Sequence, residues 1–125
     1  MADFVVALRA ADAGASVVVL GDLNDFEGSQ PLAVLEAVGL EDLVRRVPAG
    51  DRYTYVYQGN SQVLDHILVS RDLGVAAEVD AVHVNAEFPA STRASDHDPV
   101  VVGIELVVTT VARGRVGQVH QQDRV

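Results

Sequence analysis

Cysteine is absent from this 125-residue chain, which excludes disulfides, thiolate zinc sites and cysteine nucleophiles. Lysine is absent too, so the 9 basic residues are all arginines, set against 18 acidic residues for a net charge of −9. Such a chain has few cations to displace the counterions of duplex nucleic acid, so a polyanionic substrate would need metal ions to supply positive charge. No signal peptide is visible, and no apolar run is long enough to span a membrane.

Hydrophobic residues make up 49% of the chain, which is ample for the core of one domain and too many for a disordered chain. The spacing of apolar residues predicts a helix over residues 3–11 and a second helix between a cap at Ser29 and a stop at Gly39. Strands are predicted at residues 16–20, 53–57, 63–70, 81–85 and 100–108, with Gly59-Asn60 as a hairpin connection between the second and the third. Residues 1–108 are thus predicted to form the domain, and residues 109–125, which lose this periodicity, a loosely ordered tail.

This order of elements predicts an α/β fold with one mixed sheet and helices on one face. The run from Ser16 to Leu20 is apolar on both faces, which is typical of a strand that is covered on each side. Two short helices supply only one covering layer. We therefore expect an exposed apolar sheet face, or a self-association that hides it.

Two polar side chains follow the first predicted strand closely. Asp22 and Asn24 are two residues apart, so in extended backbone their oxygens point to the same side. Hard cations such as Mg²⁺ prefer oxygen ligands of this kind, with waters in the remaining positions. The alternative is a plain turn rich in Asp and Asn, and the two residues alone do not decide between them.

The strand predicted at residues 63–70 carries an acid among apolar residues. Asp65 shares one face of that strand with Val63, Ile67 and Val69, where a carboxylate is costly unless something pairs with it. The alternative is that Asp65 lies at the strand end in water.

A third polar cluster, Ser95-Asp96-His97, comes just before the last predicted strand. Adjacent residues cannot form one catalytic triad, which excludes a serine hydrolase site of that type. Extended neighbours point to opposite sides, so Asp96 and His97 would serve different subsites. The histidines without partners at metal-ligand spacing are interpreted as structural or exposed; they are His66, His83 and His120.

The three clusters together are more specific than any one of them. VVVLGDLND at residues 17–25, VLDHILVS at 63–70 and ASDHDPV at 94–100 resemble the C-terminal half of the endonuclease/exonuclease/phosphatase family, whose fold is that of pancreatic deoxyribonuclease. The surrounding NDFE at 24–27, YTYV at 53–56 and HVNAE at 83–87 resemble the bacterial extracellular nuclease branch most. The resemblance covers residues 4–108 and implies half of a four-layer α/β/β/α sandwich.

The resemblance also implies roles for five residues. Asp22 and Asn24 match the pair that orients the attacking water and the phosphoryl oxygens and, in some members, a metal. Asp65 matches the acid that pairs with the catalytic histidine, and His97 matches that histidine. Asp96 matches the metal-associated acid of the terminal Ser-Asp-His motif. The implied cofactor is a divalent ion, Mg²⁺ first, with Mn²⁺ or Ca²⁺ as alternatives.

The family fold is about twice this length, and its other, N-terminal half carries the principal metal-binding glutamate, an asparagine near the phosphate and a second histidine or tyrosine. We therefore expect a fragment of a metal-dependent phosphodiesterase acting on nucleic acid, from a secreted or cell-surface parent, with the missing half as its partner. Two alternatives stay open. One is a phosphomonoesterase or phospholipid hydrolase of the same family, and the other is a catalytically silent interaction module that pairs through its sheet face.

Overall fold

The computed structural model describes residues 1–106, and the predicted tail at 109–125 lies outside them. Their helices and strands follow in the order α1 (Ala2–Ala11), β1 (Val18–Asp22), α2 (Gln30–Ala37), β2 (Leu40–Asp42), η1 (Leu43–Arg46), β3 (Tyr55–Tyr57), β4 (Asn60–Gln62), β5 (Asp65–Ser70), α3 (Arg71–Gly74), β6 (Glu78–Ala81) and β7 (Val100–Gly103). Both predicted helices are confirmed within a residue or two. The short elements β2, η1, β4 and α3 have no counterpart in the sequence prediction.

The expectation of one mixed sheet is wrong. The described strands form three small antiparallel sheets, ordered β1-β5-β2, β3-β4 and β6-β7. A hairpin turn exists, but it joins β3 to β4 rather than to β5. Gln58 and Gly59 both have left-handed φ angles, 49° and 79°, which let Tyr57 pair directly with Asn60. The chain then leaves this ribbon at residues 63–64, and β5 pairs with β1 and β2 instead.

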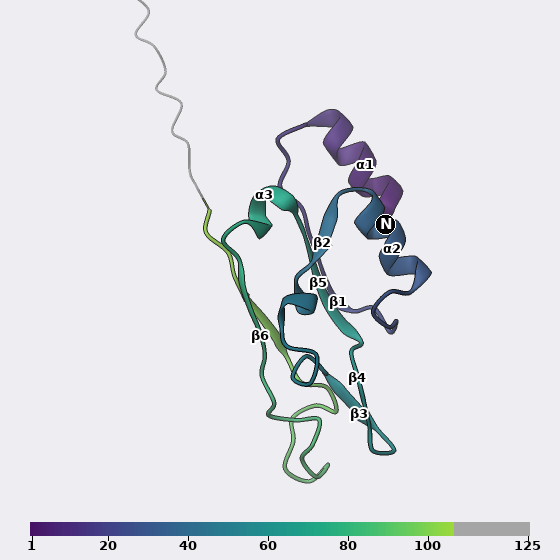
Figure 1. Ribbon diagram of the computed structural model, residues 1–125, viewed down its shortest axis with the longest axis vertical. Helices are drawn as coiled ribbons and strands as arrows, with labels where there is room; N and C mark the ends of the chain where they lie inside the picture. The colour runs from purple at the N-terminus through teal and green to yellow at the C-terminus, as the bar shows by residue number, and fades with distance from the viewer. Residues whose placement is uncertain (107–125) are drawn as a thin grey trace, which may run out of the picture.

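One face of the β1-β5-β2 sheet is covered by helices. Figure 1 shows α1 and α2 together on one side of this sheet. The core beneath them is formed by buried aliphatic residues from both helices and from the sheet, namely Val5, Val17, Leu32, Leu35, Leu40 and Leu68. On α2 the predicted apolar stripe packs here through Leu32 and Leu35, since residues three and four apart share a helix face. On α1 the predicted stripe does not pack as a whole: Val5 is buried, but the apolar side chains of Phe4 and Leu8 are 69% and 37% exposed.

The opposite face is covered over β5 but open over β1. Ile67 and Val69 of β5 pack with Val79 of β6 and with Val100 and Val102 of β7, so the β6-β7 ribbon forms a second layer. On β1, the cross-strand neighbours of Ile67 and Val69 are Leu20 and Val18, which are 65% and 41% exposed. The expected exposed apolar face is therefore present at the edge strand β1.

The strand predicted at residues 81–85 is wrong: β6 ends at Ala81, and the chain then forms a loop. The cause is Asp98, whose buried carboxylate accepts hydrogen bonds from the amides of Val84, Asn85 and Ala86. Amides held by one side chain cannot donate to a neighbouring strand. The last predicted strand is likewise shorter, since β7 ends at Gly103, and residues 107–108 lie outside the described part.

Leu68, fully buried under the helices, is the natural site to test this packing. Replacing it with alanine is expected to lower the free energy of unfolding by about 2–5 kcal/mol, because the loss of buried apolar surface and the cavity that remains both destabilise the fold. The matched control is Leu20→Ala on the exposed side of β1, which is expected to change stability by less than about 1 kcal/mol. Urea denaturation of both variants gives the comparison. Equal losses for the two would contradict the assignment of the core.

Candidate active site

The site begins with two carboxylates at one end of the β1-β5 pair. Asp22 is the last residue of β1 and Asp65 the first of β5, and they lie directly opposite each other in the antiparallel register. Side chains at such paired positions point to the same face of the sheet. The sequence expected β1 to end at Leu20, and its extension by two residues is what brings Asp22 into this pairing.

His97 completes a cluster with these two acids. Its Nδ1 lies 2.6 Å from Oδ2 of Asp65, and the ring stacks at a tilt on Tyr55 with 4.7 Å between centroids. Because a carboxylate only accepts hydrogen bonds, Nδ1 is the donor and carries a proton. One ligand atom each from Asp22, Asp65 and His97 lies within 4.8 Å of the others. The predicted pairing of Asp65 with His97 is therefore confirmed as geometry.

The charges around His97 favour its protonated form. Burial lowers the pKa of the ring, but the hydrogen bond to Asp65 and the negative charges of Asp65, Asp22 and Asp96 outweigh it. The net result is a pKa above the ordinary value of 6.5. An imidazolium aimed away from Asp65 through its other nitrogen can stabilise or protonate an anionic oxygen.

The other two predicted site residues lie beside the cluster rather than within it. Asn24 is exposed, has a left-handed φ of 51°, and donates its amide to Oδ1 of Asp22 at 2.8 Å. This is the Asp-type turn that the sequence left as an alternative, and it also fixes the Asp22 carboxylate. Asp96 is exposed and outside the three-residue cluster, near enough to influence His97 through its charge.

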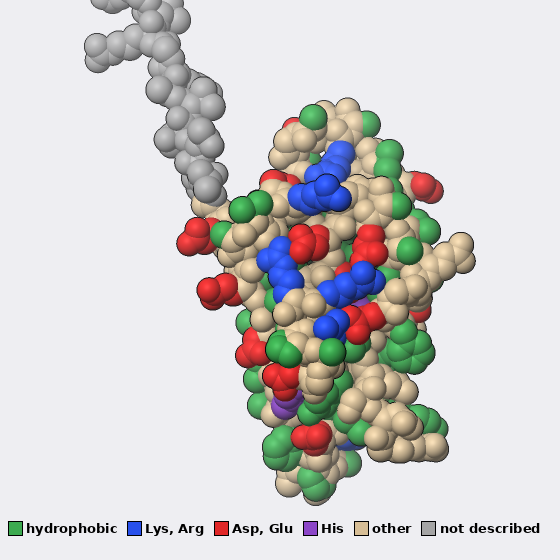
Figure 2. Space-filling model, viewed as in Figure 1, with side chains coloured by type: hydrophobic (Ala, Val, Ile, Leu, Met, Phe, Trp, Pro, Cys, Tyr) green, Lys and Arg blue, Asp and Glu red, His purple; other side chains and the backbone are tan. Residues whose placement is uncertain are grey.

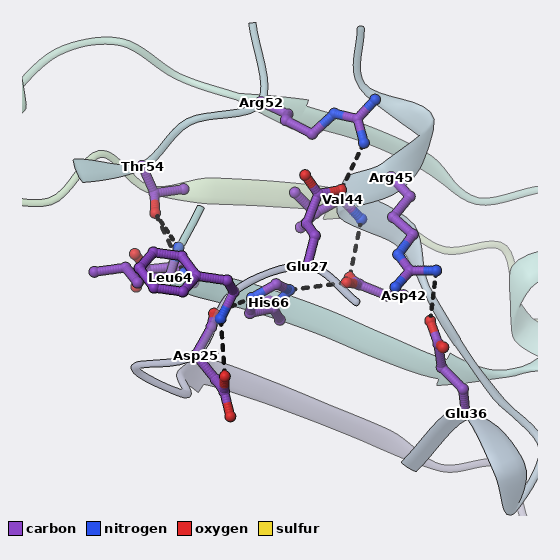
Figure 3. Close-up of polar contacts among 12 residues, drawn as sticks. Asp25, Glu27, Glu36, Asp42, Val44, Arg45, Arg52, Thr54, Leu64 and His66 are labelled. Atoms are coloured by element: carbon purple, nitrogen blue, oxygen red, sulfur yellow. Dashed lines mark hydrogen bonds and ion pairs between the residues drawn. The ribbon is translucent and has the colours of Figure 1, made fainter. Parts of the chain in front are cut away.

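A second His–Asp pair lies under the site and was missed by sequence reasoning. His66 Nδ1 is 2.8 Å from Oδ2 of Asp42, both side chains are fully buried, and His66 Nε2 bonds the backbone oxygen of Asp25 at 3.0 Å (Figure 3). The interpretation of His66 as structural holds, because this contact ties the loop after Asp22 to the sheet. The sequence held one signal for this position. Side chains alternate between the two faces along β5, so His66 must face the helix side of the sheet when Asp65 faces the other side.

A third pair joins two loops near His97. His83 Nδ1 lies 2.9 Å from Oδ2 of Asp98, and its Nε2 bonds the backbone oxygen of Asp51 at 3.1 Å. Asn85, whose amide Asp98 holds, donates its side chain to the backbone oxygen of His97 at 2.9 Å. His83 is therefore a structural residue, as expected, while His120 lies outside the described residues.

The oxygen donors of this cluster are of the kind that a divalent cation such as Mg²⁺ prefers. Asp22 offers an exposed carboxylate at the mouth of the cluster, whereas Asp65 is engaged by His97. Mg²⁺ is usually held by one or two carboxylates together with waters and phosphate oxygens. Asp22 fits that role, with the side-chain oxygen of Asn24 two residues on and the exposed Asp96 near the same histidine.

Three histidines among residues 1–106 are paired with aspartates, and these contacts predict how stability depends on pH. Burial lowers the pKa of His66, His83 and His97, but carboxylate hydrogen bonds reverse the effect, and each pKa lies above 6.5. A histidine with a raised folded pKa stabilises the protein fully below 6.5, and this contribution is lost as pH rises through the folded pKa. Two acids show the opposite shift, namely Asp72 and Asp98.

Hydrogen bonds from Ser16 and Ser70 lower the pKa of Asp72. Burial raises the pKa of Asp98, but the hydrogen bonds that its carboxylate accepts lower it by more, so the net shift is downward. Their contribution is present above 3.8 and lost as pH falls. We expect the free energy of unfolding to be largest between these ordinary values, 3.8 and 6.5, and to fall on both sides. Urea denaturation across a pH series measures it, and stability that rises steadily into the alkaline range would contradict it.

Comparison with known proteins shows the family to which the chain belongs. The chain matches the model of the Endonuclease/Exonuclease/phosphatase family over residues 1–97 and belongs to that family. Members of the family are phosphodiesterase- or phosphatase-type hydrolases, and the matched region contains all five predicted site residues. No curated protein and no solved structure matches the chain. Within residues 1–106, no helix combines the length and apolar character needed to cross a membrane.

Proposed function

We propose that this chain is the C-terminal half of a divalent-metal-dependent phosphodiesterase, a nuclease of the bacterial extracellular branch. The observation that supports it most is the contact of His97 with Asp65 at 2.6 Å, with Asp22 in the same cluster. The hydrolase family to which the chain belongs includes nucleases. A secreted or cell-surface parent protein goes with that branch.

In this proposal each residue has a definite task. Asp65 fixes the ring of His97 and keeps the proton on Nδ1, so Nε2 is the atom that exchanges a proton with the attacking water or a phosphoryl oxygen. Asp22 and Asn24 orient the water and the phosphate, and Asp96 adds a carboxylate on the other side of His97. A bound Mg²⁺, or Mn²⁺ or Ca²⁺ in its place, would polarise the phosphate and offset its negative charge.

A phosphomonoesterase or phospholipid hydrolase of the same family is the second candidate. The observation that favours it is charge, since the chain carries a net −9. On the face shown in Figure 2, arginine side chains lie among acidic ones. Two of these arginines are engaged in ion pairs: Arg45 with Glu36 at 3.0 Å, and Arg46 with Glu41 at 2.6 Å. Paired arginines attract a long nucleic acid weakly, which favours a smaller phosphorylated substrate.

The proposed partner is the N-terminal half of the family domain, placed against the open side of β1. β1 is an edge strand of its sheet, and its exposed Val18 and Leu20 form an apolar surface beside the catalytic end at Asp22. Edge strands with apolar residues favour pairing with another strand. Self-association through the same surface is the alternative, and with it a role as an interaction module without catalysis.

The chain alone is expected to be inactive or nearly so, because the proposal places the main metal anchor in the other half. The test uses a complex of the chain with the N-terminal half of the family domain, encoded by the same gene or taken from a relative. We call this complex the assembled enzyme. Hydrolysis of bis(p-nitrophenyl) phosphate, plasmid DNA, p-nitrophenyl phosphate and phosphatidylcholine vesicles is then measured with and without Mg²⁺.

Mg²⁺-dependent cleavage of the diester and the plasmid by the assembled enzyme, but not by the isolated chain, would support the proposal. Cleavage confined to the monoester or to the vesicles would favour the second candidate instead. Strong cleavage by the isolated chain that disappears in Asp22→Ala would contradict the need for a second half. Absence of hydrolysis under all conditions, with a stable complex formed, would favour the interaction module.

A further inference from the structure

Thr54 is a polar residue with no exposed surface, located just before β3. Its amide donates to the backbone oxygen of Gln62 at 2.9 Å, which extends the β3-β4 ladder by one residue. A buried threonine needs partners for its hydroxyl and its carbonyl oxygen, because unpaired polar atoms are costly inside a protein. The partners found here belong to the two segments that carry the proposed catalytic pair.

The hydroxyl of Thr54 holds the beginning of β5. Its Oγ1 accepts a hydrogen bond from the backbone amide of Leu64 (Figure 3) and another from that of Asp65, each at 3.2 Å. These amides lie where the chain enters β5, at the end of the strand where Asp65 pairs with Asp22. The side chain of Thr54 therefore sets where the backbone of Asp65 lies.

The backbone of Thr54 holds the segment that carries His97. Its carbonyl oxygen accepts a hydrogen bond from the amide of Asp98 at 2.7 Å, and the next residue, Tyr55, forms a β-bridge with His97. Tyr55 also stacks on the His97 ring. Thr54 thus links both members of the Asp65–His97 pair, although these are 32 positions apart in the sequence.

We propose that Thr54 is a positioning residue for the Asp65–His97 pair. Without its hydroxyl, the amides of Leu64 and Asp65 lose their acceptor, and the start of β5 shifts relative to His97. The hydrogen bond from Nδ1 of His97 to Asp65 then lengthens or breaks, and the ring loses its fixed tautomer and orientation. This inference rests on the proposed function for its catalytic consequence, but its geometric part is independent of any activity.

The test compares Thr54→Val, which keeps the shape and removes the hydroxyl, with Thr54→Ser, which keeps the hydroxyl. The matched control is Ser70→Ala at the other end of β5, because Ser70 is equally buried and its Oγ accepts from the amide of Val17 at 3.0 Å. Imidazole ¹⁵N spectra of the full chain, recorded well above the histidine titration range, report which ring nitrogen carries the proton. His97→Gln assigns the signal.

Wild type, Thr54→Ser and Ser70→Ala are expected to show the Nδ1–H tautomer of His97, and Thr54→Val a shift toward the Nε2–H tautomer that free imidazole rings prefer. In the assembled enzyme, Thr54→Val should lower kcat on the order of 10- to 100-fold with little change in KM, since small misplacements of catalytic groups have effects of this size. Should Thr54→Val fail to fold, Thr54→Ala removes the same hydroxyl with less bulk and gives the same readouts.

A Thr54→Val spectrum identical to that of wild type, with a loss of stability like that of Ser70→Ala, would overturn the inference and leave Thr54 a purely structural residue. A tautomer shift in an assembled enzyme that has no hydrolytic activity even as wild type would support the inference and refute the proposed function. The two failures are therefore distinguishable.

Discussion

Replacing His97 with glutamine is expected to lower kcat of the assembled enzyme on the order of 10²- to 10⁴-fold, the usual contribution of a general acid or base. Glutamine can still donate a hydrogen bond to Asp65, but it cannot exchange a proton at the position of Nε2. The measurement is steady-state hydrolysis of bis(p-nitrophenyl) phosphate at saturating Mg²⁺. A loss confined to KM would show that His97 only binds the substrate.

Asp65→Asn is a milder variant that tests the same pair from the side of the carboxylate. Asparagine keeps the shape but not the charge, so the pKa of His97 is expected to fall and the ring to lose its fixed tautomer. The matched control is Asp80→Asn on the exposed side of β6, which has the same chemistry away from the cluster. If Asp80→Asn and Asp65→Asn have the same activity, Asp65 has no role in catalysis.

Replacing Asp42 with alanine is expected to lower the free energy of unfolding by about 3–5 kcal/mol, the usual effect of removing one partner of a buried ion pair. Asp42 and His66 are both fully buried, so the variant leaves the ring without its carboxylate in a place that water does not reach. The amide of Val44, which Asp42 also accepts from at the start of η1, loses its partner as well. Urea denaturation at neutral pH gives the value.

The adjacent residue supplies the control for Asp42. Glu41 forms an ion pair with Arg46 at 2.6 Å, but both side chains are more than a third exposed, Glu41 at 41% and Arg46 at 35%. Exposed pairs contribute about 0–1 kcal/mol, so Glu41→Ala should have a small effect. Equal losses for the two variants would contradict the buried His66–Asp42 pair as a main support of the sheet.

Local sequence patterns predicted a good part of the fold and of the site. The helices at α1 and α2 follow from apolar spacing, and the strands at β1 and β5 from β-branched runs. The proximity of Asp65 to His97 came from an apolar strand face that a lone carboxylate disfavours, together with the family resemblance. The turn at Asn24 was one of two alternatives left open, and only the hydrogen bond from its amide to Asp22 decided it.

Errors occurred where a residue's partner is distant in the sequence. The loop after β6 has the composition of a strand, but Asp98 holds its amides from more than ten positions away. The division into three sheets likewise depends on which strands pair. β5 pairs with β1 and β2 and not with β4, although β4 is nearer in the sequence. Alternation of apolar residues tells which face of a strand is buried, not which strand lies beside it.

The sequence by itself determined the hydrolase family, the two helices, the two strands β1 and β5 and the residues of the candidate site, because these depend on local periodicity and on short motifs. Only the tertiary structure decided that Asp22 pairs with Asp65 across two strands, that Asp42 lies against His66 and that Thr54 links Asp65 to His97. The contacts of Asp42 and Thr54 satisfy polar groups that burial would otherwise make costly. Burial is a property of the whole packed chain, so no single segment of the sequence encodes it.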